Sequence, residues 1–276
     1  MNHKVLLVLL LMFTQVTQST WAATSEATSA AAAHARGDYR AELKITRPLA
    51  AKGIAWAQAA LGSSFSNGHG VKRNDAEAAK WYRRAAEKGD ATAQYQLGTM
   101  LVNGKGVDRD YVEAVHWYEQ AAQQGHQDAQ HDLGLMYRTG WGVDQDYVQA
   151  VKWYRLAATQ GSPSAQFDLG MMYSSGKGVL KDHVQAAQWY QLAAAQGHLN
   201  AQQELGTMYD LGKGVMQDYE VAHMWLNLSA IDGDLRATKL REDLAARMTT
   251  VQVANAQKMA RECLARKFKK CGGAVW

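Results

Sequence analysis

Residues 129–161 read AQHDLGLMYRTGWGVDQDYVQAVKWYRLAATQG, and this stretch decides the fold. Four of its features recur every 36 residues: the Leu-Gly pair, the Gly-x-Gly-Val motif, the tryptophan and the closing glycine. A spacing kept without interruption over five copies predicts a tandem array of structural repeats. We place the repeats at residues 54–89, 90–125, 126–161, 162–197 and 198–233.

Each repeat is predicted to form two helices. In the second repeat, Ala93, Leu97 and Leu101 follow one another at intervals of four, which places them on one face of a first helix. A Gly-x-Gly turn ends that helix, and Asp110 is expected to cap the second helix in a capping box with the residue three positions later. Gly125 is expected to supply a left-handed C-cap.

The use of glycine is unusual, with 24 glycines against two prolines among 276 residues. Twenty of the glycines fill four fixed slots of the five repeats, so they mark turns and helix ends rather than a flexible chain. One slot, represented by Gly98, lies in the middle of a first helix, where glycine costs about 1 kcal/mol relative to alanine. We therefore expect a Trp or Tyr ring to pack against this glycine.

Both ends depart from the 36-residue pattern, as the caps of a repeat array should. Residues 37–53 match only the second half of a repeat and are interpreted as an N-terminal capping half-repeat that contains Pro48. Residues 234–276 lose the Gly-x-Gly turn and are predicted to form C-terminal capping helices, the last of which runs from about residue 250 to 266. The Ala/Ser/Thr-rich residues 23–36 are predicted to be a flexible tether.

Residues 1–22 have the composition of a secretory signal peptide. Lys4 precedes nine apolar residues at 5–13, and the small residue Ala22 marks the expected cleavage point. Nine residues cannot span a bilayer core, which takes roughly 20, so no transmembrane segment is expected in the mature chain. The prediction is a periplasmic or secreted protein; the alternative is a cytosolic protein with an apolar N-terminus.

The motif of the third repeat, from Ala129-Gln130 to Gly161, resembles the Sel-1-like repeat, a relative of the tetratricopeptide repeat. The resemblance covers residues 38–247, with minor departures at Leu101 and His183, where the family has tyrosine. It implies an all-α fold, a right-handed α-solenoid of antiparallel helix pairs with a concave face. It also implies an adaptor or scaffold, in a family with many exported bacterial members and no common catalytic residues.

Specificity is expected at first-helix positions that vary between repeats, because the consensus residues build the core. The middle three repeats carry large side chains there, and the resemblance implies that these side chains line a concave groove for a protein or peptide partner. The alternative is that they pack between adjacent first helices. The candidates are Tyr95, Thr99, His131, Leu135, Arg138, Phe167 and Met171, together with Trp141 in a Gly-x-Gly turn.

Signatures of enzymes are scarce. The chain has no HExxH, CxxC, GxSxG or Walker motif, and its histidines show no metal-ligand spacing, so we expect no cofactor and no metal. Ser174 and Lys177 fit the S-x-x-K pattern of penicillin-binding enzymes, although no Lys-Thr-Gly follows. The alternative function is therefore a β-lactamase-like or cell-wall hydrolase, which some cysteine-rich relatives in the resembled family have been described as.

Two cysteines, Cys263 and Cys271, enclose seven residues. In an unbroken helix their Cα atoms would be about 12 Å apart, beyond the reach of a disulfide. If the last helix ends near residues 266–269, the chain can fold back and join them. The spacing also resembles that of the cysteine-rich branch of the family. We predict a disulfide in an oxidising compartment; two free thiols are the alternative.

The charge of the chain is uneven. The net charge is +4, but residues 236–276 alone carry ten Lys and Arg against three acidic residues. The overall value is too small to indicate nucleic-acid binding. The basic end either contacts an anionic surface or simply places cations at a helix C-terminus, where they are favoured. We expect a monomer.

Overall fold

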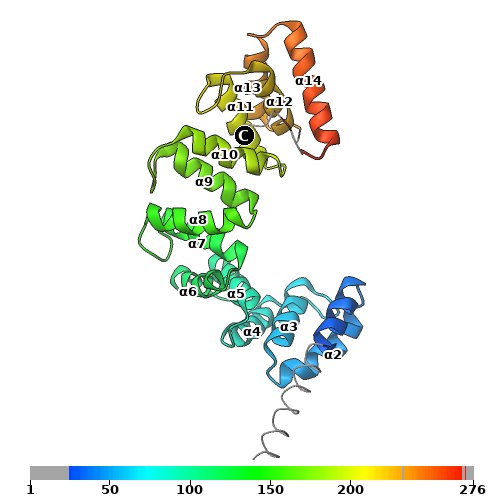
Figure 1. The fold of residues 1–276 in the computed structure, drawn as a ribbon. Coiled ribbons are helices and arrows are strands. Elements are labelled where there is room, and N and C mark those ends of the chain that lie inside the picture. The colour runs from blue at the N-terminus through cyan, green and yellow to red at the C-terminus, as the bar shows by residue number, and fades with distance from the viewer. Residues whose placement is uncertain (1–24, 232, 269–270, 272–276) are drawn as a thin grey trace, which may run out of the picture. The chain divides into compact units, whose positions relative to one another are not determined.

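Helices follow one another without strands in the part of the chain that the computed structural model describes, residues 25–231, 233–268 and 271. The chain divides into two compact modules, the N-terminal module ending at His126 and the C-terminal module beginning at Gln127. The predicted all-α fold of repeated helix pairs is confirmed within each module (Figure 1). None of the described helices is both long and apolar enough to cross a membrane.

The N-terminal module contains the capping half-repeat and the first two repeats. Its labelled helices are α2 (Tyr39–Ala51), α3 (Ala55–Asn67), α4 (Asp75–Ala86), α5 (Ala91–Asn103) and α6 (Tyr111–Gln123). Residues 25–35 are also helical, and Ala30 and Ala33 are buried, so the tether expected over residues 23–36 is replaced by a packed helix where the structure describes it. Alanine is the best helix former, which explains the difference.

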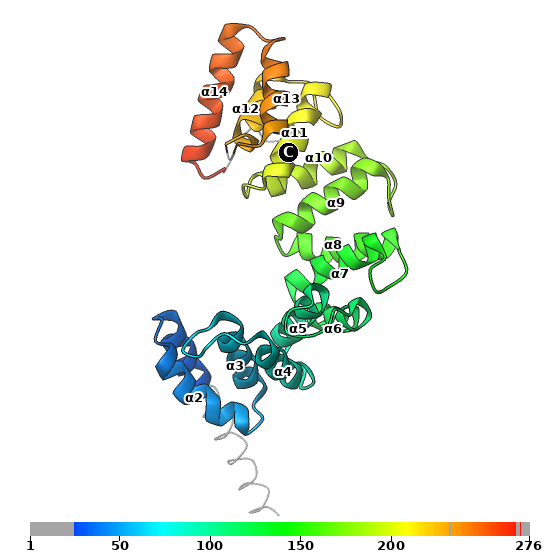
Figure 2. The same cartoon turned by 180° about the vertical axis from the view of Figure 1, so that it is seen from behind.

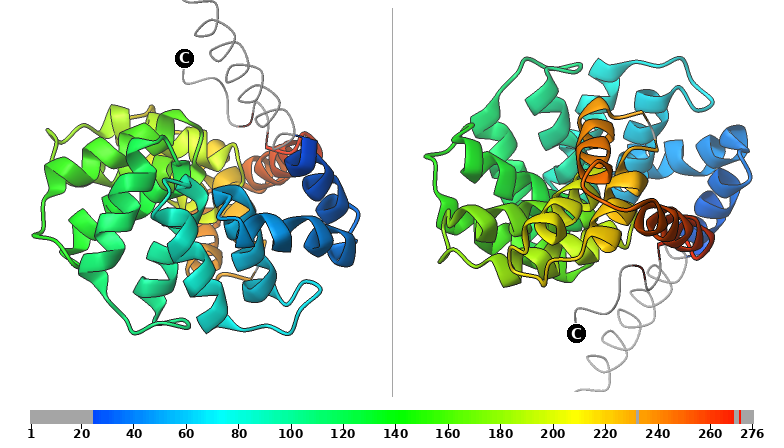
Figure 3. Two further views of the ribbon diagram at one scale, coloured as in Figure 1. Left: turned by 90° about the horizontal axis from the view of Figure 1, so that it is seen from below. Right: turned by 90° about the horizontal axis from the view of Figure 1, so that it is seen from above.

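The C-terminal module contains the other three repeats and two further helices (Figure 2). Its helices are α7 (Gln127–Thr139), α8 (Tyr147–Thr159), α9 (Pro163–Ser175), α10 (His183–Ala194), α11 (Leu199–Leu211), α12 (Tyr219–Ser229), α13 (Leu235–Ala245) and α14 (Thr250–Ala265). Consecutive helices pack as pairs, and α14 lies against α12 at the end of the module (Figure 3). The predicted extent of the last helix is confirmed.

A capping box consists of two reciprocal hydrogen bonds, and the second helices of the repeats form one of the two. The Asp110 carboxylate accepts a hydrogen bond from the backbone N–H of Glu113 at 2.9 Å, and α4, α8, α10 and α12 begin in the same way. The side chain of Glu113 does not complete the predicted capping box; it accepts hydrogen bonds from Arg83 of α4 and from Trp117 instead. Among the described helices, only α14 has the complete box.

The glycine in the middle of each first helix lies directly under a side chain of the second helix. A Cβ atom added to Gly98 would lie 2.7 Å from Cδ1 of Tyr118, closer than real Cβ atoms approach. Tyr82, Tyr154 and Tyr190 cover the equivalent glycines, and Leu226 covers the last one. The expected ring over the glycine is thus confirmed in four repeats, and the cost of glycine in a helix is offset by this close contact.

Buried glutamines join one repeat to the next. In the N-terminal module, Gln94 donates from Nε2 to the carbonyl of Ala86 at 3.1 Å, and its Oε1 accepts from Gln124 at 2.7 Å. In the C-terminal module, Gln166 does the same with Ala158, at 3.1 Å, and with Gln196, at 2.8 Å. A buried amide needs such partners, because an unsatisfied polar atom costs about 1–3 kcal/mol. The last turn of α4 is thus tied to α5, and the last turn of α8 to α9.

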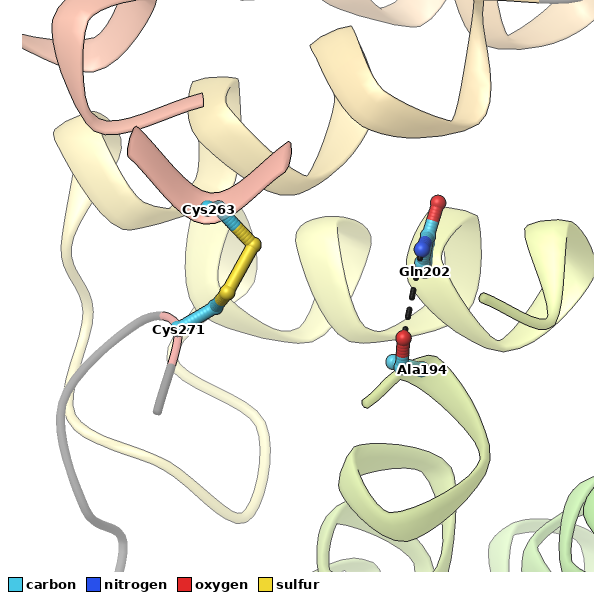
Figure 4. The surroundings of a disulfide bond; sticks show 4 residues. All are labelled: Ala194, Gln202, Cys263 and Cys271. Carbon is cyan, nitrogen blue, oxygen red and sulfur yellow. Dashed lines mark hydrogen bonds between the residues drawn. A yellow bond between two sulfur atoms is a disulfide. The ribbon is translucent and has the colours of Figure 1, made fainter. Parts of the chain in front are cut away.

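The predicted disulfide closes the end of the C-terminal module (Figure 4). Cys263 near the end of α14 is bonded to Cys271, with 5.3 Å between their Cα atoms, and both are buried. The chain reverses at Lys267 and Phe268, which both have positive φ, and the Phe268 ring packs beside Gly197. On the loop-entropy model, such a bridge contributes roughly 2–3 kcal/mol.

The close contact at Gly98 predicts an unusual mutational result. Gly98→Ala should lower the free energy of unfolding by about 1–3 kcal/mol, because the added methyl overpacks against the Tyr118 ring. In a Tyr118→Ala background the same substitution should cost less, because the clash with the ring is gone and only the Ala114 carbonyl oxygen, 3.3 Å from the added Cβ, opposes the better helix propensity of alanine. Urea unfolding of the four proteins checks this. A stabilising effect of Gly98→Ala alone would contradict it.

Candidate binding face

The candidate residues on the first helices divide between the two modules. Tyr95 and Thr99 lie on α5 of the N-terminal module, whereas the others lie on α7, on α9 and in the turn after α7. We call these outward positions the first-helix face of each module. A single groove across three repeats stays a prediction, and each module is described by itself.

In the N-terminal module, the candidates pack against neighbouring side chains. The Tyr95 ring stacks on His126 with 4.7 Å between ring centroids. The Thr99 hydroxyl donates to the Tyr95 carbonyl at 3.0 Å and lies 3.2 Å from the Tyr118 hydroxyl. These contacts favour the alternative that side chains at these two positions serve packing.

Phe167 makes the same contact in the C-terminal module. Its ring stacks on His198 at 4.8 Å, 31 residues later in the sequence, just as Tyr95 stacks on His126. His198 also caps α11, because its Nδ1 accepts a hydrogen bond from the backbone N–H of Ala201. An aromatic residue at this first-helix position therefore packs on the histidine that precedes the next first helix.

His131 lies between two carboxylates. Its Nε2 donates to Asp168 of α9 at 2.8 Å and its Nδ1 to Asp132 at 3.1 Å, when the ring is protonated. Burial by itself would lower the pKa of His131, but the hydrogen bonds to Asp132 and Asp168 raise this pKa to about 9. His131 is thus a cation at neutral pH. It joins α7 to α9 through a partly buried ion pair.

Arg138 and Met171 line a cleft of about 350 Å³ in the C-terminal module. Arg138 is held by a hydrogen bond from its Nε to the Tyr154 hydroxyl at 3.0 Å. Leu135 is half-buried and Trp141 is 46% exposed, and neither lines this cleft. The residues around the cleft are Arg138, Tyr147, Met171, Met172, Ser174, Ser175, Lys177, Tyr190 and Glu204.

The two residues of the S-x-x-K pattern meet in this cleft, but they do not activate one another. The Ser174 hydroxyl is hydrogen-bonded to the phenol of Tyr190, whose pKa is raised by burial. The ammonium of Lys177 lies 5.2 Å from the centroid of the Tyr147 ring and is not bonded to Ser174 in the described chain. A nucleophilic serine needs an adjacent base, and a protonated phenol is not one at neutral pH.

The sequence comparison agrees with this architecture. The Sel1 repeat profile matches residues 57–90, 91–126, 127–162, 163–198 and 199–234, well over half of the chain. The chain belongs to the Sel1 repeat family. Sel1 repeat proteins are generally scaffolds for protein interactions and typically lack enzymatic activity. The matched segments begin one to three residues after the repeats placed from the sequence pattern.

A solved Sel1 repeat structure shares the fold, and weaker similarity extends to other solved structures. A Sel1 repeat protein from Oxalobacter formigenes is 32% identical, with 88% of this chain and 96% of that chain covered and a TM-score of 0.74. A protective antigen with an SLR fold from uropathogenic Escherichia coli is 28% identical over 83% and 66%, with a TM-score of 0.43. An immunity protein from Pseudomonas aeruginosa is 21% identical over 79% and 82%, with a TM-score of 0.44. No curated protein matches this chain.

The sequence indicates Ser174 and Lys177 through the S-x-x-K pattern, but no motif indicates that Glu204 and Tyr147 lie in the same cleft. The turn after α9 packs tightly against the start of α8. A Cβ atom added to Gly178 would clash with the carbonyl oxygen of Tyr147, so only glycine fits at this position. The sequence pattern does not indicate this contact, because the two positions do not vary together. Lysine recurs at the position of Lys177, whereas the position of Tyr147 holds other residues in some repeats.

The ion pairs of His131 predict a stability that depends on pH. The raised folded-state pKa means that the charged ring stabilises the fold fully below about pH 6.5, and that this stabilisation is lost as the pH rises through about 9. The difference in unfolding free energy between the wild type and His131→Gln should therefore shrink between pH 6 and pH 10. Urea titrations measure it, with the exposed His116→Gln as a control. An equal difference at both pH values would contradict the assignment.

The environment of Ser174 predicts no reaction with β-lactams. A fluorescent penicillin should leave the wild type unlabelled, because Ser174 has no base and Tyr190 stays protonated. In-gel fluorescence of the mature protein after incubation with the probe measures this, with Ser174→Ala as the matched control. Covalent label on the wild type that is lost in Ser174→Ala would establish the hydrolase alternative instead.

Proposed function

We propose that this chain is an exported scaffold whose C-terminal module binds a segment of a partner protein at the cleft lined by Arg138 and Met171. The composition of the cleft carries the proposal. Its lining has a partly buried apolar part, Met171 and Met172, which we call its floor. The charged residues Arg138, Lys177 and Glu204 also line it, and sites that take up peptide segments combine such groups. The cleft lies on the first-helix face that the family resemblance implies as the binding side.

Two residues of the cleft, Arg138 and Met171, occupy positions that vary between repeats. The slot of Arg138 holds a different kind of residue in every other repeat: Ser66, Val102, Ser174 and Asp210. The slots that form the helix junctions, by contrast, repeat the same glutamine and glycine. A scaffold can therefore change its partner at such positions without losing its fold, which supports a role in recognition rather than packing for Arg138 and Met171.

Export is the second part of the proposal. The signal peptide and its cleavage near Ala22 lie outside the described residues, so the support comes from the sequence and from the cysteines. The buried bond between Cys263 and Cys271 is compatible with an oxidising compartment such as the periplasm or the medium. A protein or peptide of the cell envelope or of a host is the expected partner.

A pair of matched variants tests the binding face. The mature protein is immobilised and used to capture partners from an envelope extract, as wild type, Met171→Glu and Leu192→Glu. Leu192 is 50% exposed on α10, a second helix, and does not line the cleft. Partners should be lost with Met171→Glu and kept with Leu192→Glu, because only the former places a carboxylate in the apolar floor.

The melting temperatures of both variants serve as the control for folding. Met171 is only half-buried, so both should unfold within a few degrees of the wild type. Equal capture by the two variants would contradict a binding role for the cleft. Recovery of the full-length precursor, with residues 1–22 attached, from the cytosol alone would contradict export.

A further inference from the structure

Three charged side chains of the C-terminal module meet at the cleft. Elsewhere on the first-helix face the charged groups have partners: His131 pairs with Asp168 at 2.8 Å, and Asp210 pairs with Arg247 at 2.7 Å. Arg138, Lys177 and Glu204 all line the cleft, and none of them has an ion-pair partner in the described chain. Charges that the fold itself does not neutralise are available to a ligand.

Two of these charges are cations held in place by aromatic side chains. The Tyr154 hydroxyl fixes Arg138 through its Nε at 3.0 Å, which leaves the terminal nitrogens of the guanidinium for a ligand. Lys177 lies over the Tyr147 ring at 5.2 Å. Arg138 ends α7 and Lys177 follows α9, so the two approach the cleft from different helices. A carboxylate is a group that such a pair of cations binds strongly, because each contact is charge-assisted.

The rest of the cleft is apolar at its floor and acidic on α11. Met171 is half-buried and Met172 is almost fully buried, and methionine side chains adapt to aliphatic groups of different shapes. Glu204 lies close enough to Tyr190 for its charge to raise the phenol's pKa. No cation among the described residues pairs with it, so this carboxylate can accept hydrogen bonds from an ammonium group.

We infer that the cleft binds a linear peptide segment in which an acidic, an aliphatic and a basic residue follow one another. The acidic side chain pairs with Arg138 and Lys177, the aliphatic one covers Met171, and the basic one pairs with Glu204. This deepens the proposed function and rests on it, because it names the chemistry of the partner. A volume of about 350 Å³ suits a few side chains rather than a folded domain.

The test uses labelled, end-blocked peptides with Glu-Leu-Lys or Lys-Leu-Glu in a Gly-Ser frame, because the structure does not fix the direction of the segment. Fluorescence anisotropy with the full mature protein should detect binding of at least one of the two peptides. Affinity should fall by about tenfold or more in Arg138→Gln and in Lys177→Gln. Lys213→Gln is the matched control, because Lys213 occupies the same turn slot one repeat later and does not line the cleft; it should bind like the wild type.

A second pair of measurements isolates Glu204. Glu204→Gln should lower the affinity for whichever of the two peptides binds the wild type. It should not lower the affinity for an analogue of that peptide in which glutamine replaces lysine. Binding should also weaken as salt rises from 50 to 500 mM, because the contacts are ionic. Equal affinity for an uncharged Gln-Leu-Gln peptide, or an unchanged affinity in Lys177→Gln, would overturn the inference, as would the absence of binding by either of the two peptides.

The two proposals can fail separately. If neither peptide binds while Met171→Glu still abolishes capture of envelope partners, the cleft has a ligand of another chemistry and the scaffold proposal stands. If capture is also unaffected by Met171→Glu, in a variant whose melting temperature shows that it is folded, the proposed function itself is wrong. Circular dichroism of every variant separates both results from loss of folding.

Discussion

At four junctions, a carbonyl in the last turn of a second helix is completed by a side chain of the following first helix. Gln58 donates to Ala50, Gln94 to Ala86, Gln166 to Ala158 and Gln202 to Ala194, and the same carbonyls accept the N–H of the closing glycine. Both lone pairs of the oxygen are then used, in a position shielded from water. One repeat alone would leave this amide or this carbonyl incomplete, so the structure depends on the presence of a neighbour.

Packing then fixes the two helices of a repeat against one another. Tyr118 over Gly98 and Tyr154 over Gly134 leave no room for even a methyl group, so the distance within each pair cannot vary freely. With these contacts constant, the outward side chains differ only in their chemistry. Arg138 and Met171 thus determine the chemistry of the surface. Phe167, which stacks on His198, contributes to the packing between helices instead.

The sequence predicts most of the fold because its decisive contacts recur at a fixed spacing. Gly98 and the aromatic residue 20 positions later repeat together, and so does the N-cap of each second helix. The surface is less predictable. The partner of Phe167 is His198, whose slot holds histidine in only one other repeat, and the cleft joins Arg138 and Lys177 from separate elements. The helix at residues 25–35 was missed because no repeat exists with which to compare it.

The buried glutamines also have a consequence for how such a chain can grow. Gln58 and Gln202 keep an Oε1 atom without a hydrogen-bond partner, whereas Gln94 and Gln166 receive theirs from a glutamine at the end of the same repeat. Inner repeats are therefore interchangeable at their junctions, and the outer ones are not. Duplication or deletion of 36 residues at such a junction would keep the contact between the glutamine and the preceding carbonyl. Length, and with it the number of variable positions, can change in whole repeats during evolution.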